Sequence, residues 1–99
     1  MSDPAAEAGS WFVYVLVSAS RRATYVGVST DVERRLAQHN GAQPGGASST
    51  RSGRPWRVGA VCGPLATRST ALQLEHRIKR CNGPERLAAA RAYAGVDRG

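Results

Sequence analysis

The segment Tyr25-Val26-Gly27-Val28-Ser29-Thr30-Asp31-Val32-Glu33-Arg34-Arg35-Leu36 changes midway from strand-forming to helix-forming sequence. Glycine inside a strand usually marks a bulge or a close approach by another backbone or a ligand, and Gly27 predicts such a place. The preceding segment, Trp11 to Val17, is also rich in valine and aromatic residues. Because only a short turn separates the two segments, we expect an antiparallel hairpin that can bring Tyr14 and Tyr25 together. Tyrosines in strands are, however, mostly core residues.

The second half of the segment predicts a helix over residues 31–40. Thr30 and Glu33 have the spacing of a capping box, in which the hydroxyl accepts from an early helix amide and the carboxylate reaches back. The helical repeat then places Arg35 and His39 one turn apart on a shared face. A permanent cation beside a titratable imidazole suits phosphate chemistry, although such a pair is also common on a solvated helix face.

The rest of the chain predicts further elements of a small α+β fold. Residues 41–54 form a long Gly/Ser-rich loop, which is either a phosphate-binding segment or merely a solvated one. A third strand is expected over residues 56–62, a helix capped by Ser69 over residues 69–81, and a last helix over residues 85–94. We therefore expect a small three-stranded antiparallel sheet flanked by about three helices. The proposed limits are a disordered leader at 1–10, one domain at 11–94 and a frayed tail at 95–99.

Glu75 stands out because it lies within the apolar stripe of the expected second helix, beside Leu74 and between Ala71 and Ile78. A buried ionised carboxylate needs a partner. The residues alone favour an ordinary salt bridge to Arg or Lys, with hydrogen bonding or coordination of a cation such as Mg²⁺ as alternatives.

The chain has 99 residues with 14 Lys and Arg against seven Asp and Glu, a formal charge of +7. This excess indicates a polyanionic partner, with nucleic acid first and other polyanions or an acidic protein as alternatives. No apolar run reaches the ~20 residues that span a bilayer, so we expect a soluble, unexported protein. A zinc site is formally conceivable, but the spacings match no common ligand pattern for Cys62, Cys81, His39 and His76.

Combined, these residues resemble the GIY-YIG nuclease family. The resemblance runs from about Trp11 to Arg80 and rests on the spacing of Val13-Tyr14, Tyr25-Val26-Gly27, Arg35, His39 and Glu75. Residues 25–36, followed by Gln38-His39-Asn40, are similar to the small single-domain bacterial members, as are Thr50-Arg51 and residues 71–75. The name-giving Gly-Ile-Tyr triplet is here Phe12-Val13-Tyr14, which keeps the tyrosine.

The resemblance implies a metal-dependent DNA endonuclease, structure-selective or weakly sequence-specific, linked to DNA repair or recombination. Its implied catalytic residues are Tyr14, Tyr25, Arg35, His39 and Glu75. Glu75 would hold Mg²⁺ or Mn²⁺, and Tyr14 would act as general base with its proton drawn toward His39. Arg35 would stabilise charge on the phosphate, and Tyr25 would position water or phosphate. Because a free phenol has a pKa of about 10, we expect the surroundings to lower the pKa of Tyr14 substantially.

The implied partner is duplex, nicked or branched DNA, with a further protein supplying specificity, in the cytoplasm of a bacterium and associated with its nucleoid. Neither a membrane nor a nucleotide cofactor is expected. The expected nucleic-acid contacts are Arg34, Thr50, Arg51, Arg54 and Lys79. Larger relatives carry a polar residue, often Asn, downstream of the metal-binding Glu, and Asn82 follows unusually soon for that role. The alternatives are a non-catalytic nucleic-acid-binding module of the same fold and a basic adaptor for an acidic protein.

Overall fold

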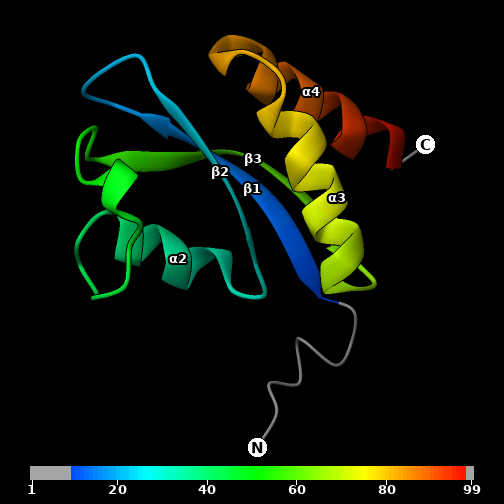
Figure 1. Ribbon diagram of the computed structural model, residues 1–99, viewed down its shortest axis with the longest axis horizontal. Coiled ribbons are helices and arrows are strands. Elements are labelled where there is room, and N and C mark those ends of the chain that lie inside the picture. Colours follow the sequence, from blue (N-terminus) through cyan, green and yellow to red (C-terminus); the bar gives the residue numbers. More distant parts are fainter. Residues whose placement is uncertain (1–9, 98–99) are drawn as a thin grey trace, which may run out of the picture.

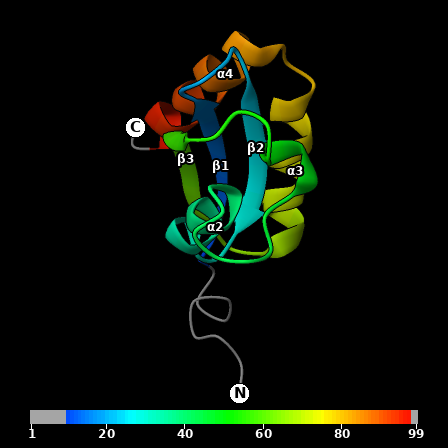
Figure 2. The same cartoon turned by 90° about the vertical axis from the view of Figure 1, so that its left-hand side faces the viewer.

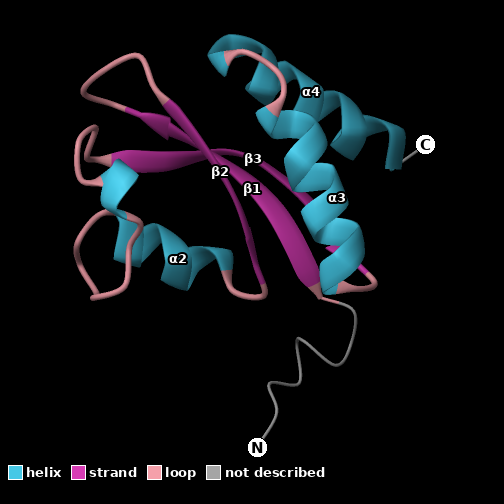
Figure 3. Cartoon of the chain, viewed as in Figure 1, coloured by secondary structure: helices cyan, strands magenta, loops and turns pink. Residues whose placement is uncertain are grey.

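The computed structural model describes residues 10–97, which form a three-stranded sheet with helices on both faces (Figure 1; Figure 3). The predicted α+β class is confirmed. Residues 1–9 of the predicted leader and residues 98–99 of the predicted tail lie outside the described range. The elements in chain order are β1 (Trp11–Ser18), β2 (Thr24–Ser29), α2 (Val32–His39), the short 3-10 helix η1 (Ser48–Thr50), β3 (Trp56–Leu65), α3 (Arg68–Lys79) and α4 (Gly83–Asp97).

The sheet has the order β2-β1-β3, and both pairs of neighbouring strands are antiparallel. The predicted hairpin is confirmed, with Tyr14 directly opposite Gly27. β3 is longer than expected, because it runs past Gly63 and pairs Leu65 with Trp11. Gly63 has a φ of +134°, a conformation open mainly to glycine, and it lies beside a register shift that lets the pairing continue.

Successive side chains along β1 point to opposite faces of the sheet, so the buried residues form two clusters, one on each face. Val13 and Val15 belong to the cluster that contains residues of α3 and α4, such as Ile78 and Ala90. Tyr14 and Leu16 point to the other face, where partly buried side chains of α2 pack against them. Figures 1 and 2 show this arrangement, with α2 on one side of the sheet and with α3 beside the edge strand β2.

Two helices begin at caps that differ from those predicted. α2 is capped by Asp31 in place of Thr30, because the Asp31 carboxylate accepts from the Arg34 amide at 3.1 Å. α3 is capped by Thr67 in place of Ser69, through the Thr70 amide at 3.1 Å, and it ends at Lys79. In each case several Ser, Thr or Asp residues are close together, and the one with extended backbone angles becomes the cap.

The last helix extends beyond the predicted residues 85–94 at both ends. Pro84 fits the first turn because that turn leaves amide groups unbonded anyway, and Glu85 accepts from the Asn82 amide at 3.2 Å. At the other end α4 continues to Asp97 and so includes residues 95–97 of the predicted tail. Among residues 10–97, no helix has both the length and the apolar character to cross a bilayer.

Candidate active site

Tyr14 occupies the middle of the central strand, and its side chain crosses the edge strand β2. It lies over Gly27, where a Cβ atom would fall 2.4 Å from the Tyr14 hydroxyl oxygen. The glycine therefore makes room for this ring. The pairing of β1 with β2 continues through Gly27 without a register shift, so the predicted bulge is absent, and a side chain of the neighbouring strand fills the space.

His39 is the last residue of α2 and has no exposed surface. Its Nε2 lies 2.9 Å from the Tyr14 hydroxyl, and its Nδ1 lies 3.0 Å from the hydroxyl of Thr50. The Tyr25 ring packs 4.5 Å from the imidazole and 6.4 Å from the Tyr14 ring, between centroids. The hairpin and α2 thus bring three of the five predicted catalytic side chains into direct contact.

Arg35 lies one turn before His39 and is partly buried. Its guanidinium donates to the Gln38 side-chain oxygen and to the Gly45 carbonyl, the latter at 3.1 Å. Burial raises the pKa of Tyr14, and Arg35 opposes that rise by hydrogen bonding and charge. The protein groups alone therefore do not lower the pKa of Tyr14, and the phenol is protonated at neutral pH; a lowered pKa in the presence of a bound metal ion stays a prediction.

The imidazole of His39 is neutral at the same pH. Burial lowers its pKa from 6.5 to about 4, and the positive charges of Arg35 and Arg54 act in the same direction. A neutral imidazole has one nitrogen that donates and one that accepts. Tyr14 and His39 therefore form a buried, uncharged pair in which one ring nitrogen can receive a proton.

Glu75 approaches from the opposite face of the sheet, on α3. The neighbouring stripe residues Ala71, Leu74 and Ile78 are buried, as predicted, whereas the Glu75 side chain keeps 18% of its surface exposed. Its carboxylate pairs with Lys79 at 3.4 Å. The salt bridge that the residues alone favoured is present. The negative charge of Glu75 is the smallest of the five influences on the pKa of Tyr14 and acts to raise it.

The donor set suits a hard cation with one protein carboxylate and does not suit zinc. Within residues 10–97 no three His, Cys, Asp or Glu side chains are grouped as a metal site, and Cys62 lies in the cluster on the far face from His39. Mg²⁺ commonly takes one or two carboxylates and completes its shell with water and substrate phosphate oxygens. Glu75 fits that arrangement, because its partner Lys79 is 49% exposed and can release the carboxylate.

Comparison with known proteins accounts for this geometry. The GIY-YIG catalytic domain matches residues 10–88, which include all five side chains. The chain belongs to the GIY-YIG family. A UPF0213 protein of Vibrio cholerae is 37% identical over 91 residues, which cover 88% of this chain and 83% of that relative.

Other relatives share the GIY-YIG domain but are much longer. The structure-specific endonuclease subunit slx1 of Schizosaccharomyces japonicus is 45% identical over 64 residues, which are 63% of this chain and 23% of that protein. The protein of the same name in Schizosaccharomyces pombe is 43% identical over 56 residues, 57% of this chain and 21% of that protein. The chain therefore spans less than a quarter of the length of these slx1 relatives.

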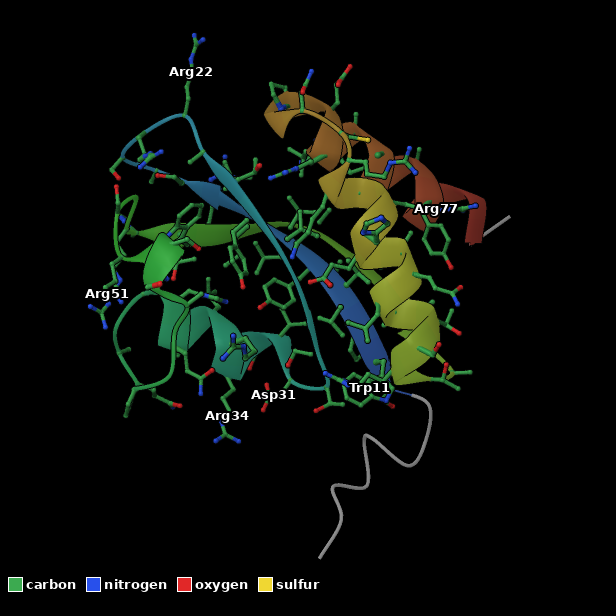
Figure 4. The ribbon with its side chains drawn as sticks, viewed as in Figure 1. Trp11, Arg22, Asp31, Arg34, Arg51 and Arg77 are labelled. Carbon is green, nitrogen blue, oxygen red and sulfur yellow. The ribbon has the colours of Figure 1, made fainter. Side chains whose placement is uncertain are left out.

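The five predicted nucleic-acid contacts of this GIY-YIG domain divide into two groups. Arg34 and Arg51 are exposed and point away from the domain on the side of α2 (Figure 4). The other three also make contacts within the protein. Arg54 donates through Nε to the His39 carbonyl at 2.7 Å and Lys79 pairs with Glu75, but both side chains are exposed and both stay predicted contacts. Thr50 is fully buried and does not fit the prediction.

Two residues that hold the long loop were missed by the sequence reasoning. The Asn40 side chain bonds both backbone groups of Trp56, at 2.6 and 2.9 Å, and the Trp56 indole donates to the Thr50 carbonyl at 2.7 Å. Nothing in the local sequence around Asn40 indicates a partner sixteen residues away. Asn82 lies in the turn before α4, where its amide is bonded to Glu85.

Proposed function

We propose that this GIY-YIG domain is a divalent-metal-dependent endonuclease that hydrolyses phosphodiester bonds in DNA, selecting for structure or weakly for sequence, in repair or recombination. The observation that carries the proposal is the buried 2.9 Å contact between Tyr14 and the neutral imidazole of His39, with Arg35 and Glu75 both acting on the same phenol. The names of the slx1 relatives, structure-specific endonuclease subunits, support the choice of substrate.

In this proposal Glu75 holds Mg²⁺ or Mn²⁺. The cation supplies charge that polarises the phosphate and its leaving group. Arg35 stabilises negative charge accumulating on the phosphate, and Tyr25, whose ring packs at a tilt against the imidazole, orients the water or the phosphate.

Tyr14 works best as a relay, because its raised pKa makes a free phenolate costly. As the phenol oxygen takes a proton from the attacking water, its own proton passes to Nε2 of His39, and Tyr14 stays neutral throughout. A bound phosphodiester anion offsets the charge of Arg35 and so raises the pKa of His39 when a base is needed. The imidazole is then the final proton acceptor.

The deciding experiment compares wild type with Glu75→Gln on nicked, flapped, branched and linear DNA and on RNA, with Mg²⁺ or Mn²⁺. The matched control is Glu85→Gln, because the Glu85 carboxylate accepts from the Asn82 amide at the start of α4 and is not one of the candidate site residues. We expect cleavage by wild type and control, and binding without cleavage by Glu75→Gln. Equal cleavage by wild type and Glu75→Gln would overturn the proposal. Binding without cleavage by every form would favour the non-catalytic nucleic-acid-binding module instead.

A protein partner that supplies specificity is part of the proposal. The slx1 relatives are named as subunits, and this chain corresponds to less than a quarter of their length. If the chain alone cleaves branched and linear DNA at equal rates, that result would be consistent with such a partner. Strong discrimination by the chain alone would show that none is needed.

A further inference from the structure

Thr50 is a fully buried hydroxyl residue in the loop that packs on α2. Its hydroxyl lies 2.7 Å from the Ala47 carbonyl oxygen and 3.0 Å from Nδ1 of His39. A hydroxyl has a single proton to donate, and a carbonyl oxygen can only accept. The Thr50 proton therefore goes to Ala47, and the Thr50 oxygen turns a lone pair toward the imidazole.

This arrangement determines which nitrogen of His39 carries the proton. Nδ1 faces a lone pair, so it must be the donor, and in a neutral ring Nε2 then faces the Tyr14 hydroxyl as an acceptor. The other tautomer would place two lone pairs against each other at Thr50 or force its hydroxyl off Ala47. The penalty for leaving a buried polar group unpaired is enough to favour one tautomer by roughly fivefold to a hundredfold.

The backbone contacts of Thr50 keep its hydroxyl from turning away. The Thr50 amide donates to the same Ala47 carbonyl at 3.0 Å, and the Thr50 carbonyl accepts from the Trp56 indole at 2.7 Å. On its other sides, His39 faces the cations Arg35 and Arg54 and the phenols Tyr14 and Tyr25. Within residues 10–97 no carboxylate is among the groups that shift its pKa, so none favours a doubly protonated ring.

We infer that Thr50 is a positioning residue that fixes His39 as the Nδ1–H tautomer, so that Nε2 stays open to the proton of Tyr14. This inference names a role for Thr50 in place of nucleic-acid contact. Its catalytic consequence rests on the proposed function, whereas the tautomer itself is a property of the folded chain and can be measured without DNA.

The test of the tautomer is the long-range nitrogen–proton NMR spectrum of the histidine side chains at pH 7.5, with the exposed His76 as internal reference. We expect His39 to be almost wholly Nδ1–H in wild type and in Thr50→Ser, which keeps the hydroxyl. Thr50→Val keeps the shape and removes the acceptor, so the Nε2–H form should rise to about half or more of the population. A wild-type spectrum showing Nε2–H, or an unchanged tautomer in Thr50→Val, would overturn the inference.

The test of the consequence is cleavage under the same conditions. We expect kcat of Thr50→Val to fall at least tenfold with KM little changed, and Thr50→Ser to remain within about threefold of wild type. A tautomer shift without loss of kcat would refute the positioning role. A correct tautomer in a protein that cleaves no DNA would refute the proposed function and leave the tautomer assignment standing. Because wild type and Thr50→Ser suffice for the first measurement, the inference stays testable even if Thr50→Val does not fold.

Discussion

Replacement of Gly27 by alanine tests whether the candidate site depends on the close packing of Tyr14 over β2. The added Cβ would lie 2.4 Å from the Tyr14 hydroxyl oxygen and 2.5 Å from the ring carbon that bears it. Ordinary van der Waals contact begins at 3.4 Å, so the ring must move by about 1 Å. Tyr14 is only 1% exposed and has no open space into which it can retreat.

Two opposing contributions set the magnitude for stability. Gly27 is not among the glycines with positive φ, so alanine can adopt its backbone angles and should by itself stabilise by about 0.4–1 kcal/mol. Overpacking a filled interior costs about 1–3 kcal/mol. We therefore expect a net loss of about 0.5–2 kcal/mol in the free energy of unfolding.

The effect on activity should be larger than the effect on stability. A shift of ~1 Å in a reacting group can reduce a rate by about a hundredfold, and here it would also stretch the 2.9 Å contact to His39. The measurements are urea unfolding and single-turnover cleavage at a temperature where all variants are folded. Gly83→Ala is the control, because the nearest side-chain atom there, Oγ1 of Thr24, is 3.8 Å away.

A double-mutant cycle with Tyr14→Leu separates the steric effect from any other. The shorter side chain removes the clashing atoms, so Gly27→Ala should be neutral or stabilising on that background. If Gly27→Ala costs the same with Tyr14 and with Leu at position 14, the packing argument is refuted. Wild-type stability and cleavage in Gly27→Ala would refute it as well.

Three further predictions follow from the site. The lowered pKa of His39 means that the unfolded chain binds a proton more readily than the folded chain between about pH 4 and 6.5. The free energy of unfolding, measured by urea titration, should therefore fall as the pH drops through that window, and it should depend less on pH in His39→Gln. Tyr14→Phe leaves a buried imidazole nitrogen without its donor and should cost about 1–3 kcal/mol in the free energy of unfolding, while cleavage is lost. Arg34→Ala and Arg51→Ala should weaken DNA binding and each reduce the salt-dependence slope by about one, whereas Arg77→Ala, on α3 across the domain, should not, as fluorescence titrations at several salt concentrations would show (Figure 4).

The parts of the fold that sequence could predict are those set by neighbours along the chain. Two strands rich in valine and aromatic residues, joined by a short turn, predicted that Tyr14 and Tyr25 can come together. The helical repeat of α2 placed Arg35 one turn before His39. The strand and helix types follow from such local preferences, since each residue's partner lies within a few positions. Cap residues such as Thr67 were missed, because several neighbouring side chains offered the same chemistry.

Long-range contacts could not be predicted in this way. Thr50 and Arg54 lie in a loop without periodicity, where small and basic residues are equally compatible with a phosphate contact or a solvated surface. In the fold the Thr50 hydroxyl is buried against the imidazole of His39, whereas Arg54 stays exposed and donates to the His39 backbone carbonyl. Only the positions of α2 and the loop in space could distinguish these roles.

The sequence alone determined the class of the fold and the identity of the five candidate catalytic side chains, because both depend on residue types and on their spacing along the chain. The tertiary structure decided which atoms meet. It placed the Tyr14 ring over Gly27, closed the buried contacts from Tyr14 to His39 to Thr50, and paired Glu75 with Lys79 on α3. The reason is physical: strand register and helix packing set distances between residues that no local propensity relates.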